Sequence, residues 1–236
     1  MSAFGLFRKQ AIIVTDVTRM EAGRVCIACL RGRQQIRLSA PQPTREWLDS
    51  IGGLNPGDTV SLKWRSVRRF RPPHSEDGDW TPSSLDKTGA LPHEQFYDVL
   101  ARHARSSVHS AFGKPAFSAR RGNPAFSADR GQRSLATMRA SSIRIYRHEN
   151  RIRADFQDER DHWSKVPVED LRLWRHLDEC PDCATTFEIR LASDMSGDEG
   201  LLRIGLGRPF QPNGRELGCF LQVNHILMPQ PLQHFS

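Results

Sequence analysis

The sequence contains no long apolar run. None of its hydrophobic stretches approaches the ~18 residues of a membrane-spanning helix. Arg8 and Lys9, near the start, are not followed by an apolar core and a small-residue cleavage site, so we expect no membrane span and no signal peptide. The 5 cysteines in 236 residues do not form the pattern of a disulfide framework. This favours a reducing, cytoplasmic compartment.

The common catalytic signatures are also absent. The chain has no P-loop and no Gly-x-Ser-x-Gly, and residues 205–209 lack the third glycine and following helix of a dinucleotide loop. Cys219 and His225 would lie about 20 Å apart along one strand, too far for a nucleophile and its base. We therefore expect no enzymatic activity, no cofactor and no resident metal.

Two Cys-x-x-Cys pairs are the remaining metal candidates. Cys26 and Cys29 lie in an apolar strand, where residues three apart point to opposite faces. Cys180 and Cys183 enclose Pro-Asp, which fits a knuckle-like turn, and His176 lies four residues upstream. Two thiolates are half of a structural zinc site. Three interpretations of Cys180 and Cys183 remain open: a zinc site, a redox-active dithiol, or two free thiols.

Acidic residues are nearly missing from one long window. Residues 99–148 hold ten Lys or Arg and one acid, Asp129, and this charge of +9 exceeds the +7 of the whole chain. A general preference for arginine, 29 Arg against 5 Lys, does not explain the missing acids. A charge this concentrated attracts polyanions, and arginine binds phosphate in two places and stacks on bases. The window predicts a nucleic-acid partner.

Hydrophobic alternation predicts a mainly β protein. The first 70 residues read as short strands at 11–17, 25–30, 36–38 and 59–67, with a small helix at 45–51 that Thr44 caps. Residues 71–91 read as a turn-rich stretch, and Pro92 opens a helix to about residue 105. Strands return at 135–138, 141–147, 151–156, 201–206 and 219–226. We predict two small OB-like β-barrels, residues 1–90 and 135–236, joined by a helix and an Arg-rich loop at 91–134.

The period of two also predicts a binding face on the second barrel. It places polar side chains outward, namely Arg144, Tyr146, Arg151, Arg153, Arg203, Gln222 and Asn224. Cations for phosphates, an aromatic for stacking and amides for base edges are the combination that single-strand-binding barrels use. A solvated sheet face is the alternative interpretation.

The Arg-rich loop contains a near-repeat. Pro-Ala-Phe-Ser-Ala occurs at residues 115–119 and again at 124–128, so Phe117 and Phe126 are either exposed for stacking or buried as anchors. Long loops without regular structure are often functional. We predict that Arg120, Arg121, Arg130 and Arg133 contact phosphates and that Phe126 or Tyr146 stacks on a base.

The order of elements resembles the bacterial dual OB-fold (DuOB) family. The resemblance covers nearly the whole chain and rests on short motifs: the strand ending near Thr15-Asp16, Gly23-Arg24-Val25-Cys26-Ile27-Ala28, Ile36-Arg37-Leu38, Pro56-Gly57-Asp58, and Pro73-His74-Ser75-Glu76-Asp77 followed by Trp80. Gln35 stands where the family has a tryptophan. The resemblance implies two OB barrels and nucleic-acid binding, within a defence or repair system, and it implies no catalytic residues.

Two other functions remain open. The basic segment also fits an interaction subunit that docks on an acidic protein partner. His74, Glu76, Asp77 and Asp79 form an acidic cluster that fits Mg²⁺ in a nuclease or, equally, turns and ion pairs with the chain's own arginines. A nuclease would lose Mg²⁺-dependent cleavage in Glu76→Gln with Asp77→Asn.

Overall fold

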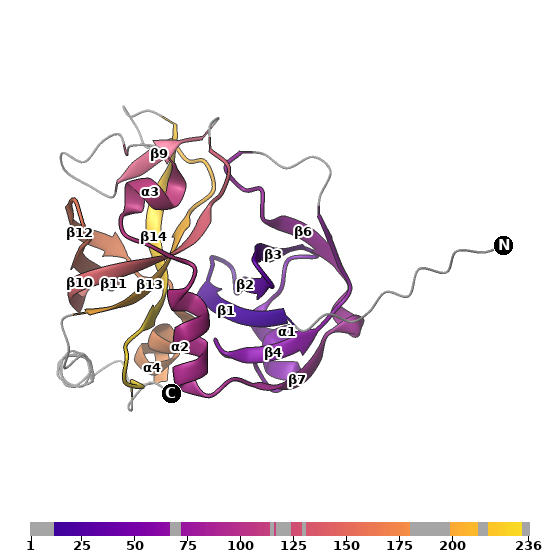
Figure 1. Ribbon diagram of the computed structural model, residues 1–236. Coiled ribbons are helices and arrows are strands. Elements are labelled where there is room, and N and C mark those ends of the chain that lie inside the picture. The colour runs from indigo at the N-terminus through magenta and orange to yellow at the C-terminus, as the bar shows by residue number, and fades with distance from the viewer. Residues whose placement is uncertain are drawn as a thin grey trace.

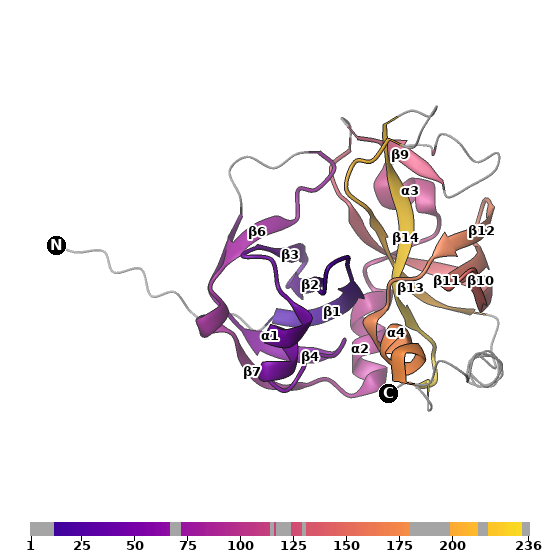
Figure 2. The same ribbon diagram turned by 180° about the vertical axis from the view of Figure 1, so that it is seen from behind.

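The computed structural model describes residues 12–66, 72–113, 116, 124–128, 131–179, 199–211 and 217–232. In these ranges the protein is mainly β, and its strands form two curled sheets that lie side by side (Figures 1 and 2). No helix in the described ranges has the length and apolar character needed to cross a membrane.

The first sheet is built from the amino-terminal part of the chain. Its strand order is β5-β6-β3-β2-β1-β4-β7. The elements are β1 (Ile12–Arg19), β2 (Val25–Arg31), β3 (Gln34–Ala40), α1 (Arg45–Ser50), β4 (Asp58–Ser61), β5 (Trp64–Ser66), β6 (Asp77–Trp80), the short 3-10 turn η1 (Pro82–Ser84) and β7 (Asp86–Ala90). Because β4 pairs with β1, and β5 begins just after β4 and pairs with β6, the chain curls this sheet back on itself.

The second sheet follows a helical connection. The connecting elements are α2 (His93–Ala101), β8 (Ala104–Arg105) and α3 (Val108–Phe112). The sheet has the order β12-β11-β10-β13-β14-β9, and β8 pairs with β10. Its elements are β9 (Ala125–Ser127), β10 (Leu135–His148), β11 (Arg151–Gln157), β12 (His162–Pro167), α4 (Leu171–Glu179), β13 (Glu199–Leu206) and β14 (Gly218–Leu227). A parallel bridge from Val168 to Val223 brings the end of β12 back to β14, so this sheet also curls.

The two sheets repeat one order of elements. Each begins with three antiparallel strands, β1-β2-β3 and β10-β11-β12, followed by a helix, α1 or α4. The next strand, β4 or β13, pairs antiparallel with the first strand of its sheet. A later strand, β6 in the first sheet or β14 in the second, runs parallel to the third strand or to the residue that follows it, while β5 and β7 are additional strands of the first sheet.

Local sequence signals set several boundaries as expected. The Thr44 side chain accepts a hydrogen bond from the backbone N–H of Trp47, 3.2 Å away, at the start of α1. Gly52 and Gly53, with φ of +78° and +80°, follow that helix in the left-handed region that only glycine enters freely. Pro92 precedes the first residue of α2, where a missing N–H costs nothing.

Several predicted segments differ from the structure. The helix predicted from Pro92 to about residue 105 ends at Ala101, and Ala104–Arg105 form β8. The strand predicted at 59–67 is two strands, β4 and β5, separated by Leu62 and Lys63. The strands predicted at 135–138 and 141–147 are one continuous strand, β10. The turn-rich stretch at 71–91 contains β6 and β7, because backbone pairing to β3, β5 and β4 holds these polar segments extended without an apolar pattern.

Backbone hydrogen bonds through Glu169 join the two sheets. The backbone N–H of Arg19, on β1, donates to the carbonyl of Glu169, and the N–H of Glu169 donates to the carbonyl of Val223, on β14, each at 2.8 Å. Apolar clusters fill the inside of each sheet. Because β14 packs against β1, and Arg203 on β13 bonds to Asp16 on β1, the second face of these two strands is buried and does not contact solvent.

Candidate functional site

A cleft of about 860 Å³ lies between the two sheets. Four turns and loops reach it: residues 20–24 after β1, His74 before β6, Asn150 and Arg151 at the β10–β11 turn, and residues 207–210 after β13. Helices α1 and α4, one from each half, lie on the same side of the molecule (Figure 2). The cleft is therefore a property of both halves together.

The described lining of this cleft is strongly basic. It contains two acids, Glu21 and Glu169, against six arginines: Arg19, Arg24, Arg37, Arg45, Arg151 and Arg208. Arg37 is buried and already bonded, but the other five arginines are at least partly exposed. An anion entering the cleft meets these guanidinium groups on both sides, and each can bind a phosphate in two places.

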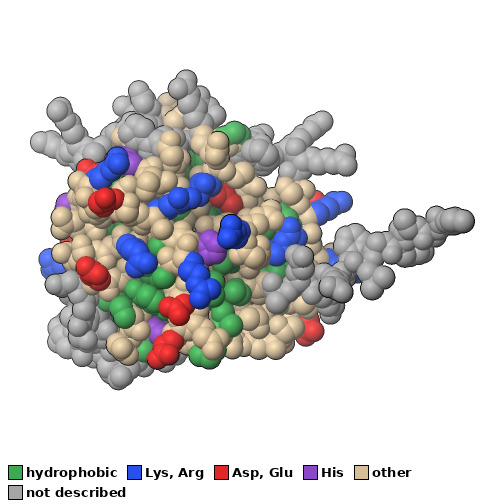
Figure 3. All heavy atoms as spheres, in the orientation of Figure 1, with side chains coloured by type: hydrophobic (Ala, Val, Ile, Leu, Met, Phe, Trp, Pro, Cys, Tyr) green, Lys and Arg blue, Asp and Glu red, His purple; other side chains and the backbone are tan. Residues whose placement is uncertain are grey.

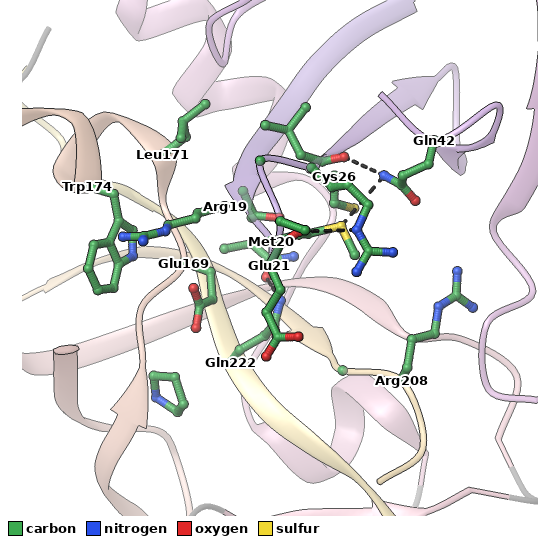
Figure 4. A pocket seen from close by; sticks show the side chains of 18 of the residues that line it. Arg19, Met20, Glu21, Cys26, Gln42, Glu169, Leu171, Trp174, Arg208 and Gln222 are labelled. Carbon is green, nitrogen blue, oxygen red and sulfur yellow. Dashed lines mark hydrogen bonds between the residues drawn. The ribbon is translucent and has the colours of Figure 1, made fainter. Parts of the chain in front are cut away.

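Aromatic surface lies beside these cations. The guanidinium of Arg19 lies 4.3 Å from the ring centre of Trp174, on α4, and the indole N–H donates to the carbonyl of Val168 at 2.9 Å. Figure 4 shows Arg19 extended across Trp174, with Glu169 beside the pair. Phe210, at the end of the loop after β13, is 61% exposed and is the most exposed large apolar side chain of the described residues.

Glu169 lines the cleft, and its backbone is held by hydrogen bonds on both sides. Its carbonyl accepts a hydrogen bond from β1 and its N–H donates one to β14, so the position of its Cα, from which the side chain extends, is fixed. Burial raises the pKa of its carboxyl to about 7, although Arg151, Arg19 and Arg153 oppose that shift. The carboxylate makes no hydrogen bond or close ion pair with any described residue.

Four predicted site residues do share one face. In the β10–β11 ribbon Tyr146 pairs with Arg153 across the strands, Arg144 lies two residues along the strand from Tyr146, and Arg151 lies at the turn. The hydroxyl of Tyr146 donates to Asp155 at 2.9 Å, and the guanidinium of Arg144 lies 5.3 Å from its ring centre. Since Arg151 also lines the cleft, the ribbon face continues the basic surface outward.

The prediction that Arg203 faces solvent is wrong. Its side chain is 2% exposed and its Nε donates to Asp16, 2.7 Å away on β1. Burial alone would raise the pKa of Asp16, but the charge of Arg203 and hydrogen bonds from Thr15, Arg203 and Asn224 lower it below its ordinary value. Asn224, also predicted outward, donates to the same carboxylate at 3.0 Å. Alternation placed both residues opposite the core correctly, but the first sheet covers that face.

The prediction that Phe126 stacks on a base is also wrong. Its side chain is fully buried, with its ring centre 5.2 Å from that of Phe112, and β9 pairs with β14. It is an anchor of the second core. Arg133 is half-buried. Phe117, Arg120, Arg121 and Arg130 lie outside the described residues, as do Cys180 and Cys183.

The acidic cluster forms a structural network. Glu76 accepts hydrogen bonds from the backbone N–H groups of Ser134 and Leu135 and from the Ser134 hydroxyl. Asp77 pairs with Arg37 at 3.1 Å and with Arg208 at 2.6 Å. These contacts link β6 to the start of β10 and use the oxygens that a Mg²⁺ ion would need.

The other two members of the acidic cluster, Asp79 and His74, do not form a metal site in the described ranges. Asp79 pairs with Arg65 at 3.0 Å. Burial, Arg37 and Arg208 lower the pKa of His74 to about 3, so this side chain is neutral. No group of three His, Cys, Asp or Glu in the described ranges is arranged to hold a metal.

The described basic residues of the window 99–148 lie on more than one surface. Arg102 lies at the end of α2 and Arg105 on β8. Burial lowers the pKa of His103, and so do the charges of the nearby arginines, namely Arg203, Arg33, Arg102 and Arg105. Lys and Arg side chains gather near the middle of the face that α2 occupies, with acidic side chains below them (Figure 3). Arg144 lies on the separate β10–β11 ribbon.

Sequence reasoning missed most of the cleft residues. Arg19, Arg24, Arg45, Trp174 and Arg208 come from distant parts of the chain, and none lies in the acid-poor window. The turns predicted between the strands at 11–17 and 25–30, and between those at 141–147 and 151–156, were a usable signal, because both turns line the cleft.

Comparisons with known proteins do not assign this chain to a family. No family model matches the chain, and none of the curated proteins matches it. Among solved structures it is similar to a murine DNA-binding protein bound with double-stranded DNA, with 11% identity, 94% of this chain and 96% of that chain covered, and a TM-score of 0.33. At this TM-score the likeness establishes neither a shared fold nor a shared function.

Proposed function

We propose that this protein is a non-catalytic nucleic-acid-binding module that holds a single strand in the cleft between two OB-like barrels. The observation that carries the proposal is the basic cleft itself, in which equivalent loops of the two sheets converge on six arginines and two glutamates. A cleft lined by one sign of charge concentrates an oppositely charged polymer.

The order of strands supports the OB assignment. Both halves contain three antiparallel strands, a helix, a strand that returns to the first, and a later strand that runs parallel to the third strand or to the residue after it. OB barrels bind oligonucleotides with the loops between strands 1 and 2 and between strands 4 and 5. Residues 20–24, Arg151 and residues 207–210 occupy those positions here, and all of them line the cleft.

The side chains divide into phosphate and base contacts. Arg19, Arg24, Arg45, Arg151 and Arg208 would neutralise phosphates, and Phe210 would stack on a base. If all five arginines contact phosphates, the logarithm of the binding constant falls with the logarithm of salt with a slope of about −3.5. Arg144, Tyr146 and Arg153 would extend the path along the β10–β11 ribbon.

Fluorescence anisotropy tests the proposal. Labelled single-stranded DNA, single-stranded RNA and duplex are titrated at several salt concentrations, with Mg²⁺ incubations of the same substrates to detect cleavage. Arg24→Glu with Arg151→Glu should weaken single-strand binding by more than tenfold. The matched control is Arg102→Glu with Arg105→Glu, which makes the same change in net charge on the α2 face and should leave most of the affinity.

The outcomes separate the alternatives. Equal losses in the two double variants would place binding outside the cleft, and a loss in Arg120→Glu, Arg121→Glu, Arg130→Glu and Arg133→Glu alone would assign it to the Arg-rich loop. Cleavage that requires Mg²⁺ would establish a nuclease. No binding to any substrate at low salt would refute the proposal and favour an acidic protein partner.

A further inference from the structure

Glu169 is an unusual residue to find in an anion-binding cleft. Its negative charge opposes phosphate, and its burial opposes its own ionisation. Nearby arginines offset part of that cost, yet no described residue donates a hydrogen bond to the carboxylate. Glu169 is half-buried and lines the cleft, so its carboxylate can accept hydrogen bonds from a molecule that enters there.

The backbone aims this carboxylate into the cleft. Val168 and Asp170 are both buried and form bridges to β14 and β1, so their side chains lie on the opposite side of the extended chain from Glu169. Trp174, one turn into α4, lines the same cleft, and Arg19 lies over its ring (Figure 4). A base that enters the cleft beside this stacked pair would bring its hydrogen-bonding edge to the carboxylate.

We propose that Glu169 reads the Watson–Crick edge of an unpaired guanine. This inference rests on the proposed function, because it needs a single strand in the cleft. An ionised carboxylate only accepts hydrogen bonds, through two oxygens side by side. Guanine alone among the common bases presents two adjacent donors, N1–H and the exocyclic N2–H, and both bonds are charge-assisted.

The other bases match an ionised carboxylate less well. Adenine and cytosine each place a ring-nitrogen acceptor beside their amino group, which repels the second oxygen. Uracil and thymine flank one N–H with two carbonyls. The Watson–Crick edge of a base is accessible only when the base is unpaired. Recognition of guanine by Glu169 therefore requires a single strand.

Oligonucleotides that differ at one base test the inference. An oligothymidylate DNA, and the corresponding oligouridylate RNA, with one central guanine, hypoxanthine, adenine or cytosine is titrated by anisotropy. We expect guanine to bind roughly tenfold tighter than adenine or cytosine, in the range of one bidentate base contact. Hypoxanthine keeps N1–H but lacks the N2 amino group, so it should fall between guanine and adenine.

Two variants identify the residue responsible. Glu169→Gln should abolish the preference for guanine while strengthening binding to plain oligothymidylate, because it removes a negative charge. Glu21→Gln removes the same charge from an exposed position of the same cleft, so it should strengthen binding to every oligonucleotide equally and keep the preference. The guanine-to-hypoxanthine change needs no protein variant, so the test does not depend on the folding of Glu169→Gln.

The dependence on pH gives a second readout. The charged groups around the carboxylate are Arg19 and Glu21 from β1 and its turn and Arg151 and Arg153 from β11, while β14 presents the uncharged Gln222. Protonation turns the carboxylate into a donor and an acceptor, which matches adenine or cytosine better than guanine. The preference for guanine should therefore be larger at pH 8 than at pH 6.

The failures are distinguishable. Salt-dependent binding of all four oligonucleotides with equal affinity, or a guanine preference that survives in Glu169→Gln, would overturn the inference and leave the proposed function standing. Absence of binding to every oligonucleotide would overturn both.

Discussion

Removing the charge of Asp16 should cost this protein much of its stability. The carboxylate is completely buried between the two sheets and accepts hydrogen bonds from Arg203 at 2.7 Å, Thr15 at 2.7 Å and Asn224 at 3.0 Å. Arg203 is itself 2% exposed, so Asp16→Asn leaves a buried guanidinium without a counterion. Breaking a buried pair in this way costs about 3–5 kcal/mol, a large part of the 5–15 kcal/mol typical of a folded domain.

Urea denaturation measures this cost. The matched control is Asp178→Asn, which removes the partner of Arg45 in an exposed pair and should change the free energy of unfolding by less than about 1 kcal/mol. Removing both buried charges, in Asp16→Asn with Arg203→Met, should cost roughly 2–3 kcal/mol less than the sum of the single variants. An Asp16→Asn variant within about 1 kcal/mol of the wild type would refute the reasoning.

The same pair shapes the dependence of stability on pH. The pKa of Asp16 is lower in the folded protein than in the unfolded chain, where it lies near 3.9. Its contribution is therefore present above about pH 4 and is lost as pH falls through the folded value. Asp16→Asn should lose stability at neutral pH and flatten the acid limb of the stability curve.

Four further results are expected. Phe210→Ala should weaken single-strand binding about 5- to 100-fold with little change in unfolding free energy, because an exposed stacking surface contributes to binding alone. Phe126→Ala should do the reverse, losing about 3–5 kcal/mol of stability in urea, because the ring is fully buried. The imidazole of His74, with a pKa of about 3, should show no NMR titration between about pH 8 and 4.5, and stability should decline as pH falls below about 6.5 because the unfolded imidazole binds a proton there and the folded one does not. Gly78→Ala should destabilise the first sheet by about 1–3 kcal/mol in urea, because an added Cβ would overlap the indole of Trp64.

Much of the fold could be predicted from the sequence because its strands are governed by local alternation. Along β11, Ile152, Ala154 and Phe156 are buried and their neighbours are more exposed, as a period of two requires. Such patterns fail where backbone pairing replaces side-chain burial. The polar strand β7 is exposed along its whole length and is held by its hydrogen bonds to β4, a signal that no single segment contains.

The candidate site could be predicted only in part. The face shared by Arg144, Tyr146 and Arg153 follows from alternation within two adjacent strands and their short turn. The cleft does not follow, because Arg19, Arg208 and Trp174 meet only when two sheets pack together.

The sequence by itself determined the mainly β architecture, the starting points of its first two helices and the excess of positive charge, since each depends on neighbouring residues or on composition. The tertiary structure decided where that charge acts. An arginine on a strand lies outward whenever its sheet has one wet face, but Arg203 became a buried counterion because a second sheet covers that face. Alternation distinguishes two faces of a strand, and only the packing of distant segments decides which of those faces meets water.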